Sequence, residues 1–265
     1  MNQVEQYVPG FDDFAAQLRH NRLPDTDRLR GRIFTLGFPG CSGQVSFAEH
    51  GSVHWQGLPL EPALAEGSAP AKVVQACVEL YFIDLALPPS SRQSAVLILD
   101  LRLGHGVLLH AWLDTGRKAQ GQASNFAQAL HLATLDGAAG EALPQATDEL
   151  IGKRVLNIYS QQTAVEHVYL NSRWYAYHIH GGVRHGDCDC DEASYFKLRD
   201  QLYLVTFREK AVDVAIIFVL DTQAWRNTGI AIGEVDAASG WFSVPIGARV
   251  QLLSETRYPQ GFIPL

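Results

Sequence analysis

Two similar stretches, LRGRIF at residues 29–34 and LIGKRV at residues 150–155, mark the start of the same structural unit at two points of the chain. Their glycines, Gly31 and Gly152, are 121 residues apart. Two further pairs of similar stretches follow in the same order at nearly the same offset. They are ELYF at 79–82 with QLYL at 201–204, and AVLILD at 95–100 with IIFVLD at 216–221. A repeat of this length indicates a duplicated domain rather than an array of short units.

Each half reads as short β-branched or aromatic runs separated by Gly, Ser, Asn or Pro, which is typical of β-strands. The expected strands are residues 31–38, 43–48, 52–57, 73–84 and 95–101 in the first half, and 152–160, 164–170, 173–180, 194–208 and 212–221 in the second. Many short strands at hairpin spacing favour a sandwich or an up-and-down barrel. The predicted fold class is all-β, with two tandem antiparallel barrels.

Helical periodicity occurs at residues 10–20, where Phe11, Phe14 and Leu18 predict a short N-terminal helix. Residues 122–135 are expected to form a second helix or an irregular linker. The stretch 135–148 is rich in Ala, Gly and Pro and is the natural boundary. We therefore predict an N-terminal domain at residues 1–135 and a C-terminal domain at residues 149–265.

Composition excludes several functional classes. A net charge of −7 argues against a nucleic-acid surface, which needs clustered Lys and Arg. No apolar run approaches the roughly 20 residues of a membrane span, and the N-terminus lacks the features of a signal peptide. These observations predict a cytoplasmic protein, in which the four cysteines are unbridged thiols.

The second half carries a set of polar side chains in phase with its strands, because alternate residues of a strand face the same side. Taking the face with the larger aromatics as the interior predicts an interior that contains Tyr159, Gln161, His178, His180, Tyr203 and Glu209. A Glu in such surroundings has a raised pKa or is paired with a His, and either state suits proton transfer. A His–Glu pair of purely structural role is the alternative.

From this interior we predict three catalytic residues. Glu209 is the acid or base, and Tyr159 and His178 orient the substrate or stabilise developing charge. The predicted substrate-binding residues are Gln161, His180, Tyr203, Trp174 and Phe207.

The repeat offers an internal control for this prediction. The equivalent residues of the first half are Phe38 for Tyr159, Gly40 for Gln161, Leu87 for Glu209 and, approximately, Gly57 for His178. A side chain required by the fold should occur in both copies. Its absence from the first copy favours a functional site in the second.

The acidic run DCDCDE at residues 187–192, close to His185, suggests either a metal site or a solvated turn with one or two inward cysteines. Carboxylate and thiolate ligands rarely serve one ion, and strand alternation would separate them. The turn is the favoured interpretation, and no metal is predicted. The sequence contains no nucleotide-binding motif, so no cofactor is predicted.

The whole chain resembles the molybdenum cofactor biosynthesis protein F (MoaF) family. The residues that carry this resemblance are Asp187-Cys188-Asp189, Tyr195, Leu202-Tyr203-Leu204, Arg208-Glu209-Lys210 and Thr228-Gly229. The resemblance implies two lipocalin-like (calycin) barrels in tandem. The family's name reflects genetic context more than a reaction, so it implies a fold rather than an activity.

The second half is also similar to the bacterial phenolic acid decarboxylases, single barrels of the same superfamily. The matching stretches are Ile158-Tyr159, YHIHGG at 177–182, 202–209 and 213–215. The resemblance implies that Glu209 is the acid and Tyr159 the first of two tyrosines. Gln161 replaces the second tyrosine and His178 replaces an arginine, so the bidentate anchor for a carboxylate substrate is missing.

These observations lead to one functional hypothesis and two rivals. The hypothesis is a cofactor-independent lyase, dehydratase or isomerase that acts on a small aromatic or carbonyl-bearing metabolite. The first barrel would serve as a scaffold or as the surface of a homodimer. The rivals are a small-molecule binding protein without catalysis, and a structural partner of another enzyme, which would have no enclosed pocket near Glu209.

Overall fold

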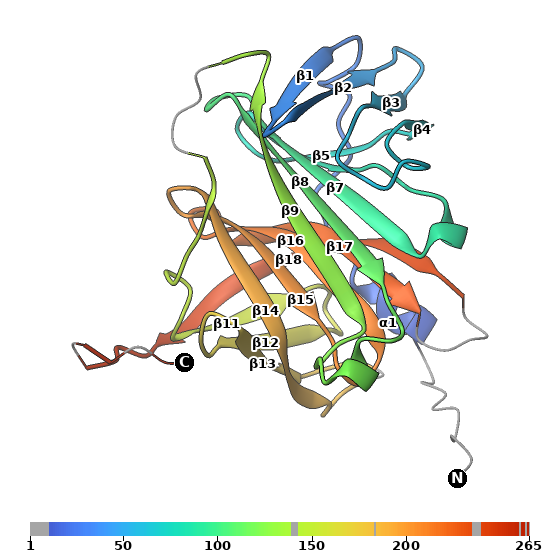
Figure 1. Ribbon diagram of the computed structural model, residues 1–265. Coiled ribbons are helices and arrows are strands. Elements are labelled where there is room, and N and C mark those ends of the chain that lie inside the picture. The colour runs from blue at the N-terminus through green and yellow to red at the C-terminus, as the bar shows by residue number, and fades with distance from the viewer. Residues whose placement is uncertain are drawn as a thin grey trace. The chain divides into compact units, whose positions relative to one another are not determined.

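The computed structural model describes residues 11–138, 143–182, 184–234, 240–259, 261–262 and 264. The chain divides into two compact units, and both consist almost entirely of antiparallel strands (Figure 1). One unit, here the N-terminal barrel, comprises Leu23–Trp112 and Ala127–Pro144. The other, the C-terminal barrel, comprises Met1–Arg22, Leu113–Phe126 and Gln145–Leu265. The predicted all-β class with two tandem lipocalin-like barrels is confirmed.

The N-terminal barrel is a sheet in the strand order β4-β3-β2-β1-β9-β8-β7-β6-β5. Its strands are β1 (Ile33–Phe38), β2 (Cys41–Phe47), β3 (Ser52–Gln56), β4 (Gly67–Pro70), β5 (Lys72–Cys77), β6 (Leu80–Asp84), β7 (Gln93–Asp100), β8 (His105–Leu113) and β9 (Phe126–Leu135). A short 3₁₀ turn, η1 (Pro89–Ser91), precedes β7. Within this sheet β1 pairs with β9, so the first and the last strand of the barrel in chain order are neighbours.

The C-terminal barrel repeats this arrangement with a complete ring of eight strands, because β14 pairs with β15 and β11 pairs with β18. Its strands are β10 (Gln145–Ala146), β11 (Lys153–Ile158), β12 (Ala164–Tyr169), β13 (Trp174–Ile179), β14 (Cys188–Arg199), β15 (Leu202–Arg208), β16 (Asp213–Asp221), β17 (Arg226–Glu234) and β18 (Phe242–Glu255). The two-residue strand β10 pairs with β14 outside the ring.

The turns show the duplication residue by residue. Gly31 and Gly152 both have positive φ, +71° and +84°. Each donates its N–H to the carbonyl of the last residue of the second strand, Phe47 or Tyr169. Glycine adopts this left-handed conformation without the steric penalty of a Cβ. The similar stretches that identified the repeat therefore form the same turn in both barrels.

A second turn is also repeated and divides two of the expected strands. Glu79 and Gln201 both have positive φ, +58° and +59°. The runs 73–84 and 194–208, each predicted as one strand, are therefore hairpins: β5 with β6, and β14 with β15. Neither turn contains Gly or Pro, and Asp200 is the one usual turn residue in the two, so the sequence signal for a break is weak.

Residues 122–135 do not form the helix or irregular linker that was predicted, because Phe126–Leu135 is strand β9. The run FAQALHLATL is rich in Ala and Leu, which favour helices. Here the open hydrogen-bonding edge of β1 decides the conformation: β9 pairs with it at Leu36↔Leu135 and Gly37↔Thr134. Tertiary pairing overrides local propensity in such cases.

The predicted N-terminal helix is present as α1 (Phe11–Gln17). Ala15 and Leu18, at the end of α1 and just after it, share a hydrophobic cluster with Val165, Ile179 and Ile246 of the C-terminal barrel. The prediction had assigned residues 1–135 to the first domain, whereas residues 11–22 and the segment 113–126, which carries the 3₁₀ turn η2 (Lys118–Gln120), group with the second barrel. No helix in the described ranges combines the length and the apolar composition needed to cross a bilayer.

Replacing Gly152 by Ala should destabilise the C-terminal barrel. A Cβ at this position would lie 2.5 Å from the carbonyl oxygen of Thr256, whose own N–H bonds to the Gly152 carbonyl. We expect a loss of about 3 kcal/mol in the free energy of unfolding, from strain and collision together. Chemical denaturation measures it.

Gly121→Ala is the matched control. Gly121 has nearly the same φ, +83°, but a Cβ there meets nothing within 4 Å. Its substitution should cost only the backbone strain, about 1 kcal/mol. Equal losses in the two variants would contradict the role of the Gly152–Thr256 contact.

Candidate functional site

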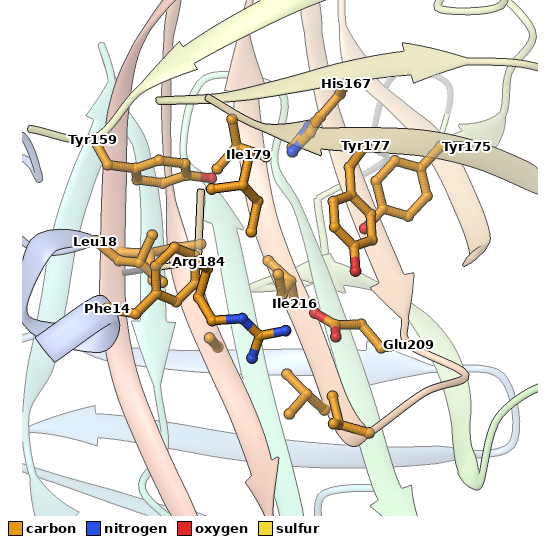
Figure 2. A pocket seen from close by; sticks show the side chains of 15 residues that line it. Phe14, Leu18, Tyr159, His167, Tyr175, Tyr177, Ile179, Arg184, Glu209 and Ile216 are labelled. Carbon is orange, nitrogen blue, oxygen red and sulfur yellow. The ribbon is translucent and has the colours of Figure 1, made fainter. Parts of the chain in front are cut away.

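The C-terminal barrel holds a pocket of about 780 Å³, a volume that includes its open mouth (Figure 2). Most of its lining is apolar. The apolar residues are Phe14, Leu18, Val165, Ile179, Val212, Val214, Ile216, Ala231 and Ile246. The polar or ionisable residues are Tyr159, His167, Tyr175, Tyr177, Arg184 and Glu209.

Glu209 follows β15 and continues its inward phase. Tyr203, Val205 and Phe207 of that phase all belong to the barrel core, as the sequence predicted. The N–H of Glu209 donates to the Val214 carbonyl, which holds the residue at the start of the turn into β16. The residue keeps some exposed surface, but its carboxyl group points into the pocket (Figure 2).

Burial raises the pKa of the Glu209 carboxyl to about 8. The charges of Asp191, Asp189 and Asp187 add to this increase, and the Arg184 guanidinium opposes it. The carboxyl group is therefore largely protonated at neutral pH. A carboxylic acid held in this state can donate a proton to a bound molecule.

A second carboxyl group, that of Asp191, lies beside Glu209. Asp191 is on the inward face of β14, directly opposite Tyr175, and only 1% of its surface is exposed. It accepts a hydrogen bond of 3.0 Å from the backbone N–H of Lys210, the residue after Glu209. Burial raises the pKa of Asp191 to about 6. Both neighbouring carboxyl groups are therefore easier to protonate than exposed ones.

Strand β13 faces the opposite way from the prediction. Tyr175, Tyr177 and Ile179 point inward and line the pocket. The ring of Tyr175 stacks on Phe207, with 3.5 Å between the centroids. Burial, together with the charges of Glu209 and Asp191, holds the pKa of Tyr177 far above its ordinary value, so its phenol stays protonated.

The placement of Trp174, His178 and His180 in the interior was therefore wrong. Trp174 packs on the outside against the guanidinium of Arg173. His178 is exposed, and His180 pairs with Glu166 at 2.9 Å on the outer face. The indole of Trp174 suggested an inward phase, but its stacking on Arg173 covers it without burial in the core.

Three further predicted residues do not line the pocket. Gln161 is exposed in the bend between β11 and β12. Tyr203 is buried, and its hydroxyl donates to Glu149 at 2.7 Å. Phe207 is a core residue beneath Tyr175. Of the eight predicted site residues, Glu209 and Tyr159 border the pocket.

Tyr159 directly follows β11 and is almost fully buried. Burial raises the pKa of its phenol, and a hydrogen bond with the Asn227 side chain partly offsets this. The Asn227 amide in turn donates to Asn157 at 2.8 Å. This buried chain holds the phenol of Tyr159 in place at the pocket wall, in its protonated form.

His167 and Arg184 border the pocket although the sequence analysis did not select them. His167 lies on β12 in phase with Val165 and Tyr169, and this alternation could have revealed its inward position. Arg184 follows Gly181-Gly182; its Nε–H donates to Asp187, and its guanidinium extends toward Glu209 (Figure 2). The pocket therefore has an arginine, although His178 occupies the position at which the decarboxylase resemblance placed one.

The acidic run 187–192 is not a turn, because β14 begins at Cys188. Cross-strand pairing puts Asp189 and Asp191 opposite the inward Tyr177 and Tyr175, so Cys188 and Cys190 face outward. The expected separation of Asp from Cys holds, but the expectation of inward cysteines was wrong. All four cysteines of the chain are thiols rather than disulfides. The described ranges contain no group of three or more His, Cys, Asp or Glu side chains able to hold a metal.

The N-terminal barrel has the same inward positions with apolar residues in them. Val45 pairs with Trp55 as His167 pairs with Tyr177. Val53 pairs with Ala69 as Tyr175 pairs with Asp191. The six equivalent pairs are Phe38 for Tyr159, Val45 for His167, Val53 for Tyr175, Trp55 for Tyr177, Ala69 for Asp191 and Leu87 for Glu209. All six N-terminal residues are buried core, so this fold does not require the polar set.

Both halves of the chain match known protein-family domains. Residues 6–114 match the MoaF N-terminal domain, and residues 144–256 match the MoaF C-terminal domain. Protein MoaF of Klebsiella aerogenes is 30% identical over 269 residues, which cover 97% of each chain. The chain belongs to the MoaF family. All polar residues of the pocket lie in the part of this MoaF family member that matches the MoaF C-terminal domain, whereas Phe14 and Leu18 of its wall lie in the part that matches the N-terminal domain.

Among solved structures, a Burkholderia vietnamiensis protein named as a "putative beta-lactamase" is similar at 14% identity, over 39% of this chain and 95% of its own. The TM-score is 0.33. The β subunit of the Streptococcus pyogenes DNA polymerase is similar at 6% identity, over 93% of this chain and 82% of its own, with a TM-score of 0.13. These scores are too low to support an argument about the MoaF fold or function.

The raised pKa of Glu209 should make the stability of this MoaF family member depend on pH. The folded protein holds the Glu209 proton up to about pH 8, whereas the unfolded chain releases it near the ordinary value of 4.5. Wild-type stability therefore falls as pH rises through this interval, because the folded state binds the extra proton. Glu209→Gln cannot ionise and should escape this loss.

Urea denaturation between about pH 5 and about pH 8 measures the effect. The free energy of unfolding of Glu209→Gln, relative to wild type, should increase steadily with pH over this range. Asp191 is present in both proteins, so most of its own titration cancels in the difference. A difference that does not change with pH would show that the Glu209 carboxyl is not desolvated.

Proposed function

We propose that the C-terminal barrel of this MoaF family member is a cofactor-independent acid/base enzyme, a lyase, dehydratase or isomerase. Its substrate is a small aromatic or carbonyl-bearing molecule. The observation that carries the proposal is the carboxyl group of Glu209, which points into an apolar pocket with its pKa raised to about 8. General acids work best when their pKa lies near the operating pH.

A carboxyl group whose pKa lies near neutral pH suits both halves of a proton transfer. Glu209 is the proton donor in its neutral state, and Asp191, with a pKa of about 6, is largely ionised beside it at neutral pH. After donation, the Glu209 carboxylate is the base for the next step. The negative charge of Asp191 favours the return of Glu209 to its neutral form, because it raises the pKa of the Glu209 carboxyl group.

The polar neighbours of Glu209 would orient the substrate. The phenols of Tyr175 and Tyr177 stay protonated, so they can donate to a substrate oxygen. The guanidinium of Arg184 extends toward Glu209 and would stabilise negative charge that develops on the substrate. The phenol of Tyr159 forms part of another side of the pocket, where its hydrogen bond with Asn227 fixes its position.

The lining also indicates the kind of substrate. Aromatic rings and branched aliphatic side chains surround most of the space, and a few polar groups converge on it, which is typical of small-molecule sites. The partner is therefore a small molecule rather than a nucleic acid or a membrane, in keeping with a cytoplasmic enzyme. The N-terminal barrel, whose equivalent interior is apolar core, would serve as a scaffold or as the surface of a homodimer.

The second candidate is a binding protein that holds the same molecule without changing it. The predominantly apolar lining, with Phe14 and Leu18 of the N-terminal segment at its wall, favours this function as well. The family's name would associate such a carrier with molybdenum cofactor or secondary metabolism. A purely structural partner of another enzyme is disfavoured, because Glu209 borders a pocket.

Glu209→Gln separates the two candidates. The amide keeps the size of the acid and can still form hydrogen bonds, but it has no acidic proton to transfer to the substrate. An enzyme should lose turnover by about 100-fold or more while the substrate still binds. Native mass spectrometry of the purified protein, followed by incubation with a panel of aromatic and carbonyl compounds, identifies the substrate and measures its conversion.

His178→Ala is the control, since His178 lies on the outer face of β13. It should convert the substrate at the wild-type rate. If wild type and Glu209→Gln both bind a compound equally and neither converts any member of the panel, the protein is a carrier and the proposed catalysis is wrong.

A further inference from the structure

His167 lies within the C-terminal barrel, at the side of the pocket that meets the aromatic core. Only 4% of its surface is exposed. Its ring makes edge contacts with Tyr175 and Phe207, with 5.4 Å and 5.0 Å between the centroids. Figure 2 shows the imidazole directed into the pocket from β12.

The hydrogen bonding of this imidazole is incomplete. Its Nδ1 atom is buried without a hydrogen-bond partner among the described residues. Buried polar groups without partners are rare, because they lose water without compensation. The N-terminal barrel shows that the fold accepts an aliphatic residue here, since Val45 occupies the equivalent position. An unpaired polar group is thus retained where the architecture does not need it.

The surroundings define what could pair with it. Burial lowers the pKa of His167 to about 3, so the ring is neutral and offers one donor and one acceptor. Aromatic rings and Val165 surround this part of the pocket, where a charged group would lose its hydration. A hydroxyl or carbonyl group on an apolar ring satisfies both conditions.

We propose that His167 is a specificity-determining residue that selects ligands carrying an uncharged hydroxyl or carbonyl group on an aromatic or other apolar body. The ligand would place that group against the imidazole and the rest of its body along the aliphatic wall. The inference rests on the proposed function in taking this pocket as the substrate site. It specifies the substrate class whether or not conversion follows.

Two small probes of almost the same shape test it. p-Cresol and p-xylene differ in that a hydroxyl replaces a methyl group. Wild-type protein should bind p-cresol about five- to tenfold more tightly than p-xylene, as one buried hydrogen bond predicts. His167→Leu replaces the imidazole by an apolar side chain of similar size, and this variant should bind both probes with equal affinity. Calorimetric titration measures the four affinities.

Tyr169→Phe is the matched control. Tyr169 lies two residues along β12 on the same face, and its hydroxyl is also buried without a partner among the described residues, but it does not border the pocket. Removing this hydroxyl should leave the preference for p-cresol intact. Thermal unfolding should show that neither variant is strongly destabilised. The Tm of each should fall by no more than a few degrees below that of wild type, because each variant loses a polar group that had no partner.

A measurement on the unmutated protein covers the case in which His167→Leu does not fold. The side-chain ¹⁵N resonances of His167 should shift when p-cresol is added and remain unchanged with p-xylene. The inference is wrong if wild type binds both probes equally or binds neither. It is also wrong if Tyr169→Phe loses the preference as His167→Leu does.

The outcomes also separate this inference from the proposed catalysis. A preference for p-cresol that depends on His167, in a protein that converts no compound, supports the inference and contradicts the enzyme. Conversion of a compound that depends on Glu209, with equal affinity for the two probes, supports the enzyme and contradicts the inference about His167.

Discussion

The backbone hydrogen bonds between β14 and β15 and between β11 and β18 close the C-terminal strands into a ring. A closed ring leaves no free edge, and every strand has one face inside and one outside. The side chains at inward positions therefore share a small volume from which water is largely displaced. The chemistry of the pocket follows from this enclosure, because the charged form of a carboxyl group is disfavoured where water is absent.

The effect on Glu209 depends on where enclosure is incomplete. Deeper in the barrel, Phe207 and Tyr175 stack and fill the space. At Glu209 the strand gives way to a turn, and the pocket opens beside it. The carboxyl group is desolvated but accessible, and Asp191 adds a negative charge nearby that further favours the neutral acid. Burial without access would stabilise a neutral acid that could react with nothing.

The duplicated barrels show which of these features belong to the architecture. Both copies keep the left-handed glycine at the first turn, the positive φ at Glu79 and Gln201, and the pairing between equivalent inward residues. The N-terminal copy fills its inward positions with residues such as Leu87 and Trp55. Since the N-terminal copy keeps the same order of strands with an apolar interior, the architecture does not require the polar interior of the C-terminal copy.

The sequence by itself determined the duplication, the all-β class and the inward phase of the strand β15 that precedes Glu209. These features depend on local periodicity and on comparison of one half with the other, and both can be read along the chain. It did not determine the phase of β13, because Trp174 and Tyr175 are both large aromatics. Only the stacking of Tyr175 on Phe207 and of Arg173 on Trp174 decides which of them is inside. Likewise, only the folded chain brings Arg184 and His167 to the pocket and Asp191 close to Glu209, because these residues come from separate segments whose proximity depends on long-range strand pairing.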